Sequence, residues 1–523
     1  MKNMLVKTKL FLLTFIIFYF ILLLFLAKYT SIEFDETTHS LLAVFYKDLV
    51  KYSISHLNFK EMYDYGVSYL VYYPKLSIYY PPLTHLTISL FFELFSPSFL
   101  VARLVIILFS ISFMLLIFQI SKFILKNEKT ALLSVFLFAS SPISVYLSRG
   151  VYLDLPLAFF FTLSIFLYLL ALKKKEKKYY MLASLALALG FLTKWFIVLA
   201  LPIIFLYTLL EHKKYLKTVL LSFIFFGVLI SPYLFLIFKL NTFSLQYKSA
   251  IPLGTRGMPK VTSIANWLHY PYLTNKLYFV FPLSVLLLIS IYAYWKYKKP
   301  YWKLLLTWIL ILYFSLSLFP NKDPKYFFLI ITPFCLILAN FLQEYIKKNG
   351  KVFVLTVGAL LFLNFLVSFN IIPFYKVESL YGKPPCVLQF YKTYGKEISE
   401  FILSHQAPTY FASETSRALP SEVMFYLAGK GEFIKILRPC AGIGDINKTL
   451  YESGVKWIIY DTEDKNNSYI TQLKEKNLVT LEKSINGIEI YSYKFFNPYT
   501  KENCNIVCLT QEKICEKVKL SSS

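Results

Sequence analysis

The sequence is poor in charge, and acidic residues in particular are few. Charged residues make up 16% of its 523 positions, hydrophobic residues make up 57%, and the mean hydropathy is +0.55. This composition excludes an ordinary soluble globular domain, in which about 25% of residues are charged. The sequence therefore predicts a polytopic membrane protein.

The 30 Asp and Glu residues are outnumbered by 55 Lys and Arg, which gives a formal net charge of +25. In a soluble chain this excess would suggest a nucleic-acid-binding protein. Here the basic residues gather in short clusters between apolar segments, a pattern typical of sequences that orient membrane helices. We therefore expect a lipid bilayer, and no nucleic acid, as a partner.

Apolar segments that are long enough to span a bilayer run through residues 1–374. The first, 10–27, could be read as a signal peptide, but no convincing small-residue cleavage site follows it, so we interpret it as a retained helix. With the later segments it predicts an all-α membrane domain of about 11 transmembrane helices. The later segments are 99–125, 130–147, 156–172, 178–193, 195–210, 216–238, 277–295, 303–319, 326–346 and 352–371.

Basic clusters predict the orientation of these helices. If each segment crosses once, the clusters fall on the side of the N-terminus, which is then cytoplasmic. The basic clusters all fall on one side only if segment 81–95 does not cross the membrane. We interpret that short segment as an interfacial or re-entrant helix. The outer face then receives loop 28–98, loop 239–276 and the residues after about 372. The clusters are 126–129, 173–178, 211–217, 295–303 and 347–351.

Residues 375–523 have the composition of a soluble domain, and we expect a small extracytoplasmic α/β domain there. Residues 395–405 read as an amphipathic helix and 455–464 as a buried strand with a polar end. Such a domain either binds substrate or covers the membrane core. The location is weakly supported by the glycosylation acceptor patterns at Asn447 and Asn466.

Five of the six cysteines fall in this outer part of the chain. An oxidising location permits disulfides, and their odd number would leave one thiol over. Free thiols are the alternative, and a metal site is less expected because no His accompanies the cysteines of the tail. The five are Cys386, Cys440, Cys504, Cys508 and Cys515.

The centres of the predicted helices carry almost no charge, and the unusual ionisable residues collect in the outer turns. A transporter of lipid-linked sugars, the alternative from another functional class, would more often place polar groups near the membrane midplane and show related halves. The outer residues are Arg149, Asp154, Lys194, Lys322, Asp323 and Lys325, together with Glu33, Asp35 and Glu36 of "SIEFDETTHSLL". Cations can bind a phosphate leaving group, and a carboxylate can accept a proton from an attacking hydroxyl.

Several motifs, taken in order, resemble the GT-C glycosyltransferases of the protein O-mannosyltransferase and aminoarabinose-transferase group. They are "FDETTHS", "YYPPLTH" followed by "FSPSFLVARL", "SRGVYLDLPLAFFF", "LGFLTKW" and "KDPKYFFLIITPFCLILA". The resemblance covers residues 10–346. It implies transfer of a sugar, with mannose as one candidate, from a polyprenyl- or dolichyl-phosphate donor to a hydroxyl of a protein, lipid or glycan outside the cytoplasm, usually with inversion.

The resemblance also implies roles for single residues. Asp35 falls on the first-loop acid that is regarded as catalytic, with Glu36 beside it, and Asp154 falls on the acid of the second outer motif. We expect these three to be catalytic. Substrate contacts are expected from Arg149 on the same turn as Asp154, and from Lys194, Lys325 and Tyr326 near the donor phosphate.

The chain departs from this pattern at two places. Some relatives carry Lys or His where this chain has Tyr80, so phosphate binding there passes to His85 or Lys325. The "WWD"-type motif of oligosaccharyltransferases is absent, which favours transfer of a single sugar. Arg256 and His269, in the outer loop 239–276, are candidates for closing over an acceptor.

Simpler interpretations of these residues stay open at this point. Asp35, Glu36 and Asp154 could cap the helices that follow them. Lys194 could extend from a tight turn toward water, and Lys322 and Lys325 could be solvated loop charges. The histidines show no metal-ligand spacing, no cofactor is certain, and a divalent cation held by acids is a further alternative. We expect the protein in the plasma membrane.

Overall fold

The computed structural model of the chain describes residues 2–72, 80–239, 261–319, 322–369, 388, 392–413 and, with short gaps, 415–494. These residues divide into two compact units. One unit comprises Met1–Thr30, Tyr79–Thr84 and Arg103–Gln389, and the other comprises Ser31–Ile78, His85–Ala102 and Phe390–Ser523. Much of the predicted outer loop thus clusters with the C-terminal residues. The five predicted outer cysteines, Asn447, Asn466 and Arg256 lie outside the described residues.

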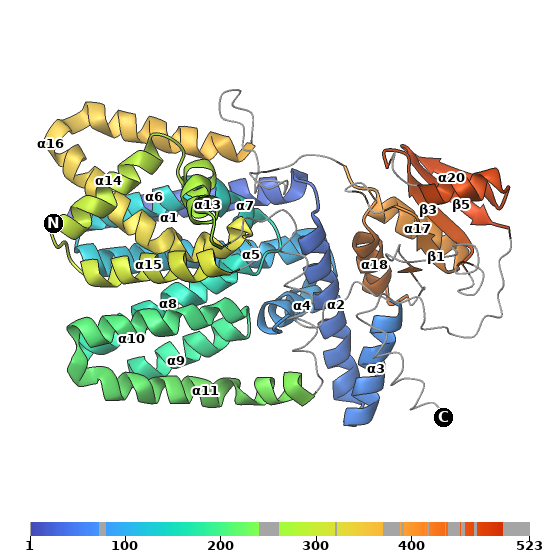
Figure 1. The fold of residues 1–523 in the computed structure, drawn as a ribbon, viewed down its shortest axis with the longest axis horizontal. Helices are drawn as coiled ribbons and strands as arrows, with labels where there is room; N and C mark the ends of the chain where they lie inside the picture. Colours follow the sequence, from blue (N-terminus) through green and yellow to red (C-terminus); the bar gives the residue numbers. More distant parts are fainter. Residues whose placement is uncertain are drawn as a thin grey trace. The chain divides into compact units, whose positions relative to one another are not determined.

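The first unit is built from apolar helices joined by short turns. Figure 1 shows α8, α9, α10 and α11 running side by side, and α8–α9 and α9–α11 are closely packed pairs. The helices are α1 (Lys2–Tyr29), most of α5 (Phe99–Leu125), α6 (Glu128–Ser140), α7 (Pro142–Arg149), α8 (Asp154–Lys174), α9 (Lys177–Phe191), α10 (Ala200–Glu211), α11 (Leu216–Lys239), α13 (Ile264–Leu273), α14 (Leu283–Lys296), α15 (Trp302–Leu318) and α16 (Ile331–Leu366). The short 3-10 helices η1 (Trp195–Leu199) and η4 (Pro324–Ile330) precede α10 and α16.

The number of spanning helices differs from the prediction of about 11. Among the described residues, six helices are long and apolar enough to cross a membrane, or seven if α6 and α7, bent by 69°, form one span. The difference arises because α9, α14, α15 and the helix formed by η1 and α10 have fewer than 18 residues. The predicted segments at 326–346 and 352–371 are joined in α16 through a kink at Gly350, whose φ is +70°.

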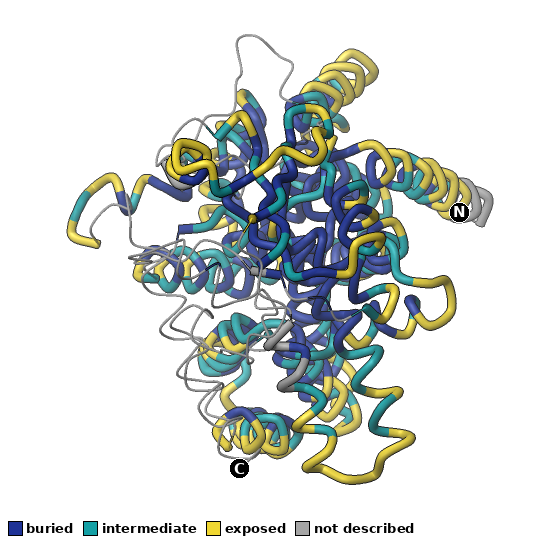
Figure 2. The backbone as a smooth tube through the Cα atoms, turned by 90° about the vertical axis from the view of Figure 1, so that its right-hand side faces the viewer, coloured by how far each residue is buried: buried dark blue, intermediate teal, exposed yellow. Residues whose placement is uncertain are grey.

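Apolar side chains cover both the inside and the outside of this unit. In α1, Leu23 and Leu26 are buried, whereas Phe18 and Ile21 are exposed. Figure 2 shows such exposed turns on the helix that begins at the N-terminus. Exposed apolar faces on long helices suit contact with lipid chains. The chain is an integral membrane protein with several spans.

Polar and basic turns meet at one end of the helical unit. The ring of Phe123 lies beside that of Tyr301, with centroids 6.0 Å apart, and Lys173 Nζ lies 4.8 Å from the Phe123 centroid. An ion pair joins Lys303 to Glu211. The turns after α5, α8, α10 and α14 are therefore neighbours, and we call this region the basic end. Four of the five basic clusters of the sequence lie in these turns.

The second unit combines helices from the predicted outer loop with a small sheet. Its helices are α2 (Phe34–Ser55), α3 (Phe59–Tyr72), most of α4 (Leu83–Phe95), α17 (Gly395–His405), α18 (Pro420–Gly429) and α20 (Ser468–Glu475). The strand order is β2 (Ile436–Leu437), β1 (Thr409–Phe411), β3 (Trp457–Asp461), β5 (Ile488–Tyr493) and β4 (Val479–Ile485). β2, β1 and β3 are parallel, and β5 pairs antiparallel with β3 and β4.

The sheet confirms the predicted α/β fold of the C-terminal residues. Helix α17 has the predicted bounds, and β3 lies within the predicted strand. Asn486 and Gly487 both have positive φ, at 49° and 86°, and connect β4 to β5 in the manner of a tight hairpin. Tyr410, Ile458, Leu473 and Tyr491 pack together as its core.

Candidate functional site

A buried cation lies at the turn between α7 and α8. Arg149 ends α7 with none of its surface exposed, and its Cζ lies 4.9 Å from the centroid of the Tyr146 ring. The Tyr152 ring stacks on that of Tyr146, and the Tyr152 hydroxyl donates to the Tyr146 hydroxyl at 2.6 Å. Gly150 permits this packing, since a Cβ there would lie 2.6 Å from a ring carbon of Tyr152.

Asp154 and Lys194 form a buried ion pair in the same unit. Lys194 Nζ donates to Asp154 Oδ1 at 2.7 Å, and the two side chains are 15% and 6% exposed. Asp154 is the first residue of α8, Leu153 is the N-cap, and Lys194 precedes η1. The Asp154 carboxylate is therefore not the N-cap of α8, and Lys194 does not extend toward water.

Lys325 has a similar environment. Its Nζ lies 3.4 Å from Asp323 Oδ2 and 5.2 Å from the centroid of the Tyr152 ring, and its side chain is 12% exposed. Asp323 caps η4 by accepting from the Lys325 backbone N–H at 3.0 Å. The interpretation of Lys325 as a solvated loop charge is therefore wrong.

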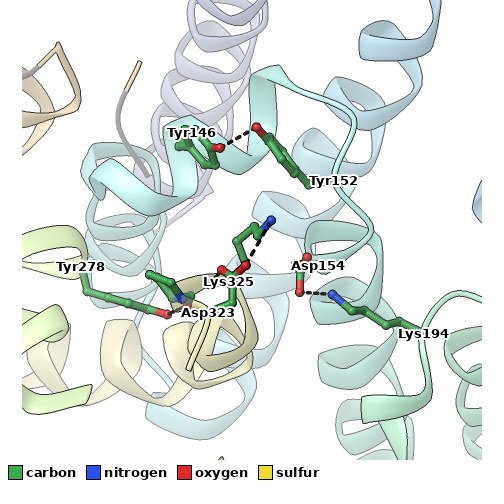
Figure 3. A network of polar contacts seen from close by, with 8 residues as sticks. Tyr146, Tyr152, Asp154, Lys194, Tyr278, Asp323 and Lys325 are labelled. Carbon is green, nitrogen blue, oxygen red and sulfur yellow. Dashed lines mark hydrogen bonds and ion pairs between the residues drawn. The ribbon is translucent and has the colours of Figure 1, made fainter. Parts of the chain in front are cut away.

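The turn between α7 and α8, the turn before η1 and the start of η4 lie close together. We call their polar and aromatic residues the lysine–tyrosine cluster: Tyr146, Arg149, Tyr152, Asp154, Lys194, Asp323, Lys325 and Tyr326. Figure 3 shows that Lys325 points toward the Tyr146–Tyr152 pair, while Lys194 reaches Asp154 from another element. Lys194 Nζ lies 4.7 Å from the Tyr326 centroid. Each lysine thus contacts one carboxylate and the face of one tyrosine, and with Arg149 the cluster holds three cations and two carboxylates. This excess of positive charge can bind an anion.

Lys322 belongs to a structural arrangement beside the cluster. Its Nζ donates to the carbonyls of Leu316, Ser317 and Phe319 at the end of α15. This is the placement that a cation favours at a helix C-terminus. Burial lowers the pKa of Lys322 to about 8. His269 Nε2 bonds the Lys322 carbonyl oxygen at 3.0 Å, and burial lowers the pKa of His269. Both are therefore held by neighbouring backbone.

The second unit holds the predicted first-loop acids at the start of α2. Glu33 is the N-cap of α2 and forms a capping box with Glu36, whose Oε2 accepts from the Glu33 backbone N–H at 3.4 Å. Glu36 is fully buried, and Asp35 is partly exposed. The capping interpretation therefore holds for Glu36, whereas Asp35, in the first turn, is not the N-cap.

One turn further along α2, the buried His39 faces the buried His85 of α4. His39 Nδ1 lies 3.2 Å from His85 Nε2, and both belong to the second unit. His85 is thus paired with a residue that the sequence analysis did not assign. The described residues contain no group of three or more His, Cys, Asp or Glu that could hold a metal ion.

The double-proline segment is fastened to the turn that carries Lys194. The Leu83 backbone N–H donates to the Leu192 carbonyl at 2.8 Å, and the half-buried Tyr80 lies just before this contact. The structure thus brings Arg149, Asp154, Lys194, Lys325 and Tyr326 together and ties the Tyr80 segment to them.

Sequence analysis missed two of the three aromatic members of the cluster. Tyr146 and Tyr152 were not assigned, although Tyr152 follows the glycine of "SRGVY" at a spacing that permits close packing. A tyrosine beside a buried lysine is a recurrent cation–π pair. In a sequence with 42 tyrosines, however, residue type alone does not single one out.

Comparisons with known proteins bear on this geometry. Residues 80–238 match the family model described as dolichyl-phosphate-mannose-protein mannosyltransferase. An uncharacterized protein of Aquifex aeolicus (strain VF5) is 24% identical over 289 residues, which is 54% of this chain and 56% of that protein. The chain therefore matches little more than half the length of this relative.

Two solved structures share the fold. ArnT from Cupriavidus metallidurans in the apo state has a TM-score of 0.62 at 12% identity, covering 92% of this chain and 97% of that one. The same protein bound to undecaprenyl phosphate has a TM-score of 0.61 at 11% identity, covering 95% and 98%. These findings confirm the predicted GT-C fold and the resemblance to the mannosyltransferase and aminoarabinose-transferase group. The family match also confirms the predicted enzyme class, a glycosyltransferase.

Proposed function

We propose that this protein transfers a single sugar from a polyprenyl- or dolichyl-phosphate donor to a hydroxyl acceptor outside the cytoplasm, with inversion at the sugar carbon. The acceptor hydroxyl belongs to a protein, a lipid or a glycan, and mannose is the first sugar to test. In this proposal the N-terminus is cytoplasmic, the C-terminal domain is extracytoplasmic, and the membrane is the plasma membrane.

The lysine–tyrosine cluster carries the proposal. Lys194 and Lys325 are largely buried, yet each keeps an ion pair that an incoming phosphate can join or replace. Burying charges costs free energy that a structural role alone does not require, because apolar residues of similar volume are often as stabilising. Cations near a membrane surface are suited to bind a lipid phosphate and to stabilise the charge that develops as it leaves.

The family match and the shared fold support the class of donor. The matched model spans the double-proline segment, the turn of Arg149 and Asp154, and Lys194. The solved ArnT structure that shares the fold was determined with undecaprenyl phosphate bound. A polyprenyl phosphate as the leaving group agrees with both.

In the proposed reaction Asp35 is the general base. The acceptor oxygen forms a bond to the sugar carbon, the bond from that carbon to the phosphate oxygen breaks, and the electron pair leaves with the lipid phosphate. The acceptor proton passes to the Asp35 carboxylate. Asp35 is partly exposed and does not cap its helix, so it can meet an acceptor. Because phosphate is a good leaving group, a general acid is not needed.

Purified protein tests the proposal when it is given a panel of polyprenyl-phosphate sugars with small hydroxyl acceptors. We expect release of free polyprenyl phosphate in proportion to glycosylated acceptor, with inverted anomeric configuration in the product. Movement of intact donor between the leaflets of proteoliposomes, without release of polyprenyl phosphate, would identify a flippase instead.

A further inference from the structure

Helix α18 of the C-terminal domain packs directly on the helix that carries Asp35. The Thr37 and Ser421 hydroxyl oxygens lie 2.5 Å apart, and both residues are fully buried. The contact extends to the following segments of the same unit, where the Phe425 ring lies 4.2 Å from that of Phe99 and 6.0 Å from that of Phe92, measured between centroids. The C-terminal domain is therefore attached to α2 within two residues of Asp35.

A buried carboxyl group lies next to this hydroxyl pair. Glu422 is 1% exposed, and its Oε1 accepts from the Thr393 hydroxyl at 2.9 Å. A Cβ on Gly395, the first residue of α17, would lie 2.5 Å from the Glu422 side chain, so the glycine leaves room for the carboxyl group. Burial raises the pKa of Glu422 to about 7, and the charges of Glu397 on α17 and Glu36 on α2 add to this effect.

We propose that Ser421 is a positioning residue, through which the C-terminal domain holds the first turn of α2 and thereby aims the Asp35 carboxylate, and that Glu422 supports it by fixing α18 to the start of α17. This inference rests on the proposed function and extends it. It makes the C-terminal domain a part of the catalytic apparatus, whereas the sequence left open whether the domain binds substrate or only covers the membrane core.

The placement of the contacts supports this role. A helix is most easily frayed at its first turn, where four backbone N–H groups have no partner within the helix. In α2 this turn carries Asp35, Glu36 and Thr37, and the domain contacts Thr37 directly. General bases must be held within a fraction of an ångström of the reacting atom, because small displacements cost large factors in rate. An anchor at this turn therefore affects the rate of transfer more than donor binding.

Single and paired variants of the full-length protein test the inference. We expect Ser421→Ala to lower kcat by about 3- to 10-fold, the range for loss of one hydrogen bond, with the donor KM unchanged. Thr37→Val should lower kcat at least as much, because the Thr37 hydroxyl also donates to the Phe34 carbonyl at 2.8 Å. The double variant should be no slower than the slower single variant, because both remove the same contact. Glu422→Ala should lower kcat more than Ser421→Ala does. Glu422→Gln should keep most of the wild-type kcat, because the amide oxygen can still accept from the Thr393 hydroxyl.

A matched control is available in the helical unit. Thr162 and Thr332 form another buried hydroxyl pair, at 2.9 Å, and neither belongs to the proposed machinery. Thr332→Ala should leave kcat within about twofold of the wild type, although it also removes one buried hydrogen bond between hydroxyl groups. A loss of kcat in Thr332→Ala equal to that in Ser421→Ala would overturn the positioning role.

Hydrogen exchange of the full chain provides a readout that does not depend on activity. In Ser421→Ala and Glu422→Ala we expect faster exchange of the backbone amides of residues 34–40 and unchanged exchange in α8. Unchanged exchange in α2, or faster exchange with normal kcat, would overturn the inference. A wild-type protein that transfers no sugar from any donor would overturn the proposed function itself, and exchange would still decide whether the domain anchors α2.

Discussion

The helical unit pairs charges at both of its ends, but in different environments. At the basic end, Lys178 and Glu176 form an ion pair with side chains 65% and 42% exposed, and Lys299 and Glu344 form one with side chains 29% and 49% exposed. In the lysine–tyrosine cluster, the side chains of Lys194 and Asp154 are 15% and 6% exposed. The same kind of pair is thus solvated in one region and buried in the other.

The difference separates charge that orients a protein from charge that binds a ligand. Exposed pairs contribute about 0–1 kcal/mol each and are screened by salt, so they can be rearranged with little consequence. A buried pair carries a desolvation cost and is sensitive to the loss of either partner. We therefore interpret the basic end as the determinant of topology and the lysine–tyrosine cluster as the binding region.

The largest contrast that we expect between the two regions is in their accessibility from outside the cell, which should be all-or-none. In a chain whose native cysteines are replaced, Asp323→Cys should react with a membrane-impermeant thiol reagent in intact cells, and Lys175→Cys should not. The reason is that the basic cluster at 173–178 predicts the cytoplasmic side. The opposite labelling pattern would place the lysine–tyrosine cluster on the cytoplasmic side and contradict the proposed reaction.

The second contrast concerns stability. Asp154→Ala leaves Lys194 buried beside no carboxylate, and breaking a buried pair in this way costs about 3–5 kcal/mol. Glu344→Ala, the matched change at the basic end, should cost about 0–1 kcal/mol. Thermal unfolding in detergent measures both. The double variant Asp154→Leu with Lys194→Met should recover most of the loss, and equal melting temperatures for the two single variants would remove the distinction between the regions.

The buried carboxyl group of Glu422 in the second unit extends the comparison. The pKa of Glu422 is raised from 4.5 to about 7 by burial, so its contribution to stability is present below about pH 4.5 and is lost as the pH rises through about 7. The shift corresponds to about 3 kcal/mol. Glu422→Gln should remove this pH dependence and raise the melting temperature at about pH 8 more than at about pH 5. Parallel pH profiles of melting temperature would show that Glu422 is not protonated in the folded state.

The next effect concerns the rate of transfer. Asp35→Asn keeps the shape of the side chain but cannot accept a proton, so kcat should fall by about 100-fold or more with donor binding intact. Glu128→Gln, which changes a carboxylate at the basic end, should have no effect on kcat. Near-normal turnover in Asp35→Asn would remove this residue from the reaction. Because Glu33, and not Asp35, is the N-cap, a large loss of helix stability is not expected in this variant.

The smallest effect is on donor affinity. Lys325→Ala removes one charged contact to phosphate, which typically costs about 1.5–3 kcal/mol, or about 10- to 150-fold in Kd. Lys325→Arg should restore part of the affinity with different geometry. Lys303→Ala, a lysine of the basic end, is the control. Titration with polyprenyl phosphate measures all three, and equal affinities for the alanine variants would assign the phosphate to other residues.

Local features of the fold could be predicted from the sequence, and its long-range contacts could not. The bounds of α5 agree with the predicted segment 99–125, because uninterrupted apolar length defines a span. The capping alternative held for Glu36 and not for Asp35, since three carboxylates within four positions fit several starting points of the helix. Only the structure shows that Glu33 is the N-cap.

The candidate site shows the same division. Arg149, Asp154, Lys194 and Lys325 could be chosen because charge is rare near apolar segments. Their carboxylate and aromatic partners lie up to 173 positions away along the chain in the case of Tyr152 and Lys325, and no local pattern records such a pairing. The Ser421–Thr37 contact, separated by 384 positions, is the extreme case.

Gly150 carries no side chain, yet any larger residue there would collide with the ring on which Lys325 rests. Substitution at this position would move an aromatic surface, and with it a cation, without changing one ionisable group. A random mutagenesis screen for defective sugar transfer should therefore recover position 150 among its hits. Such variants would keep normal amounts of protein in the membrane and resemble loss of a lysine rather than loss of a fold.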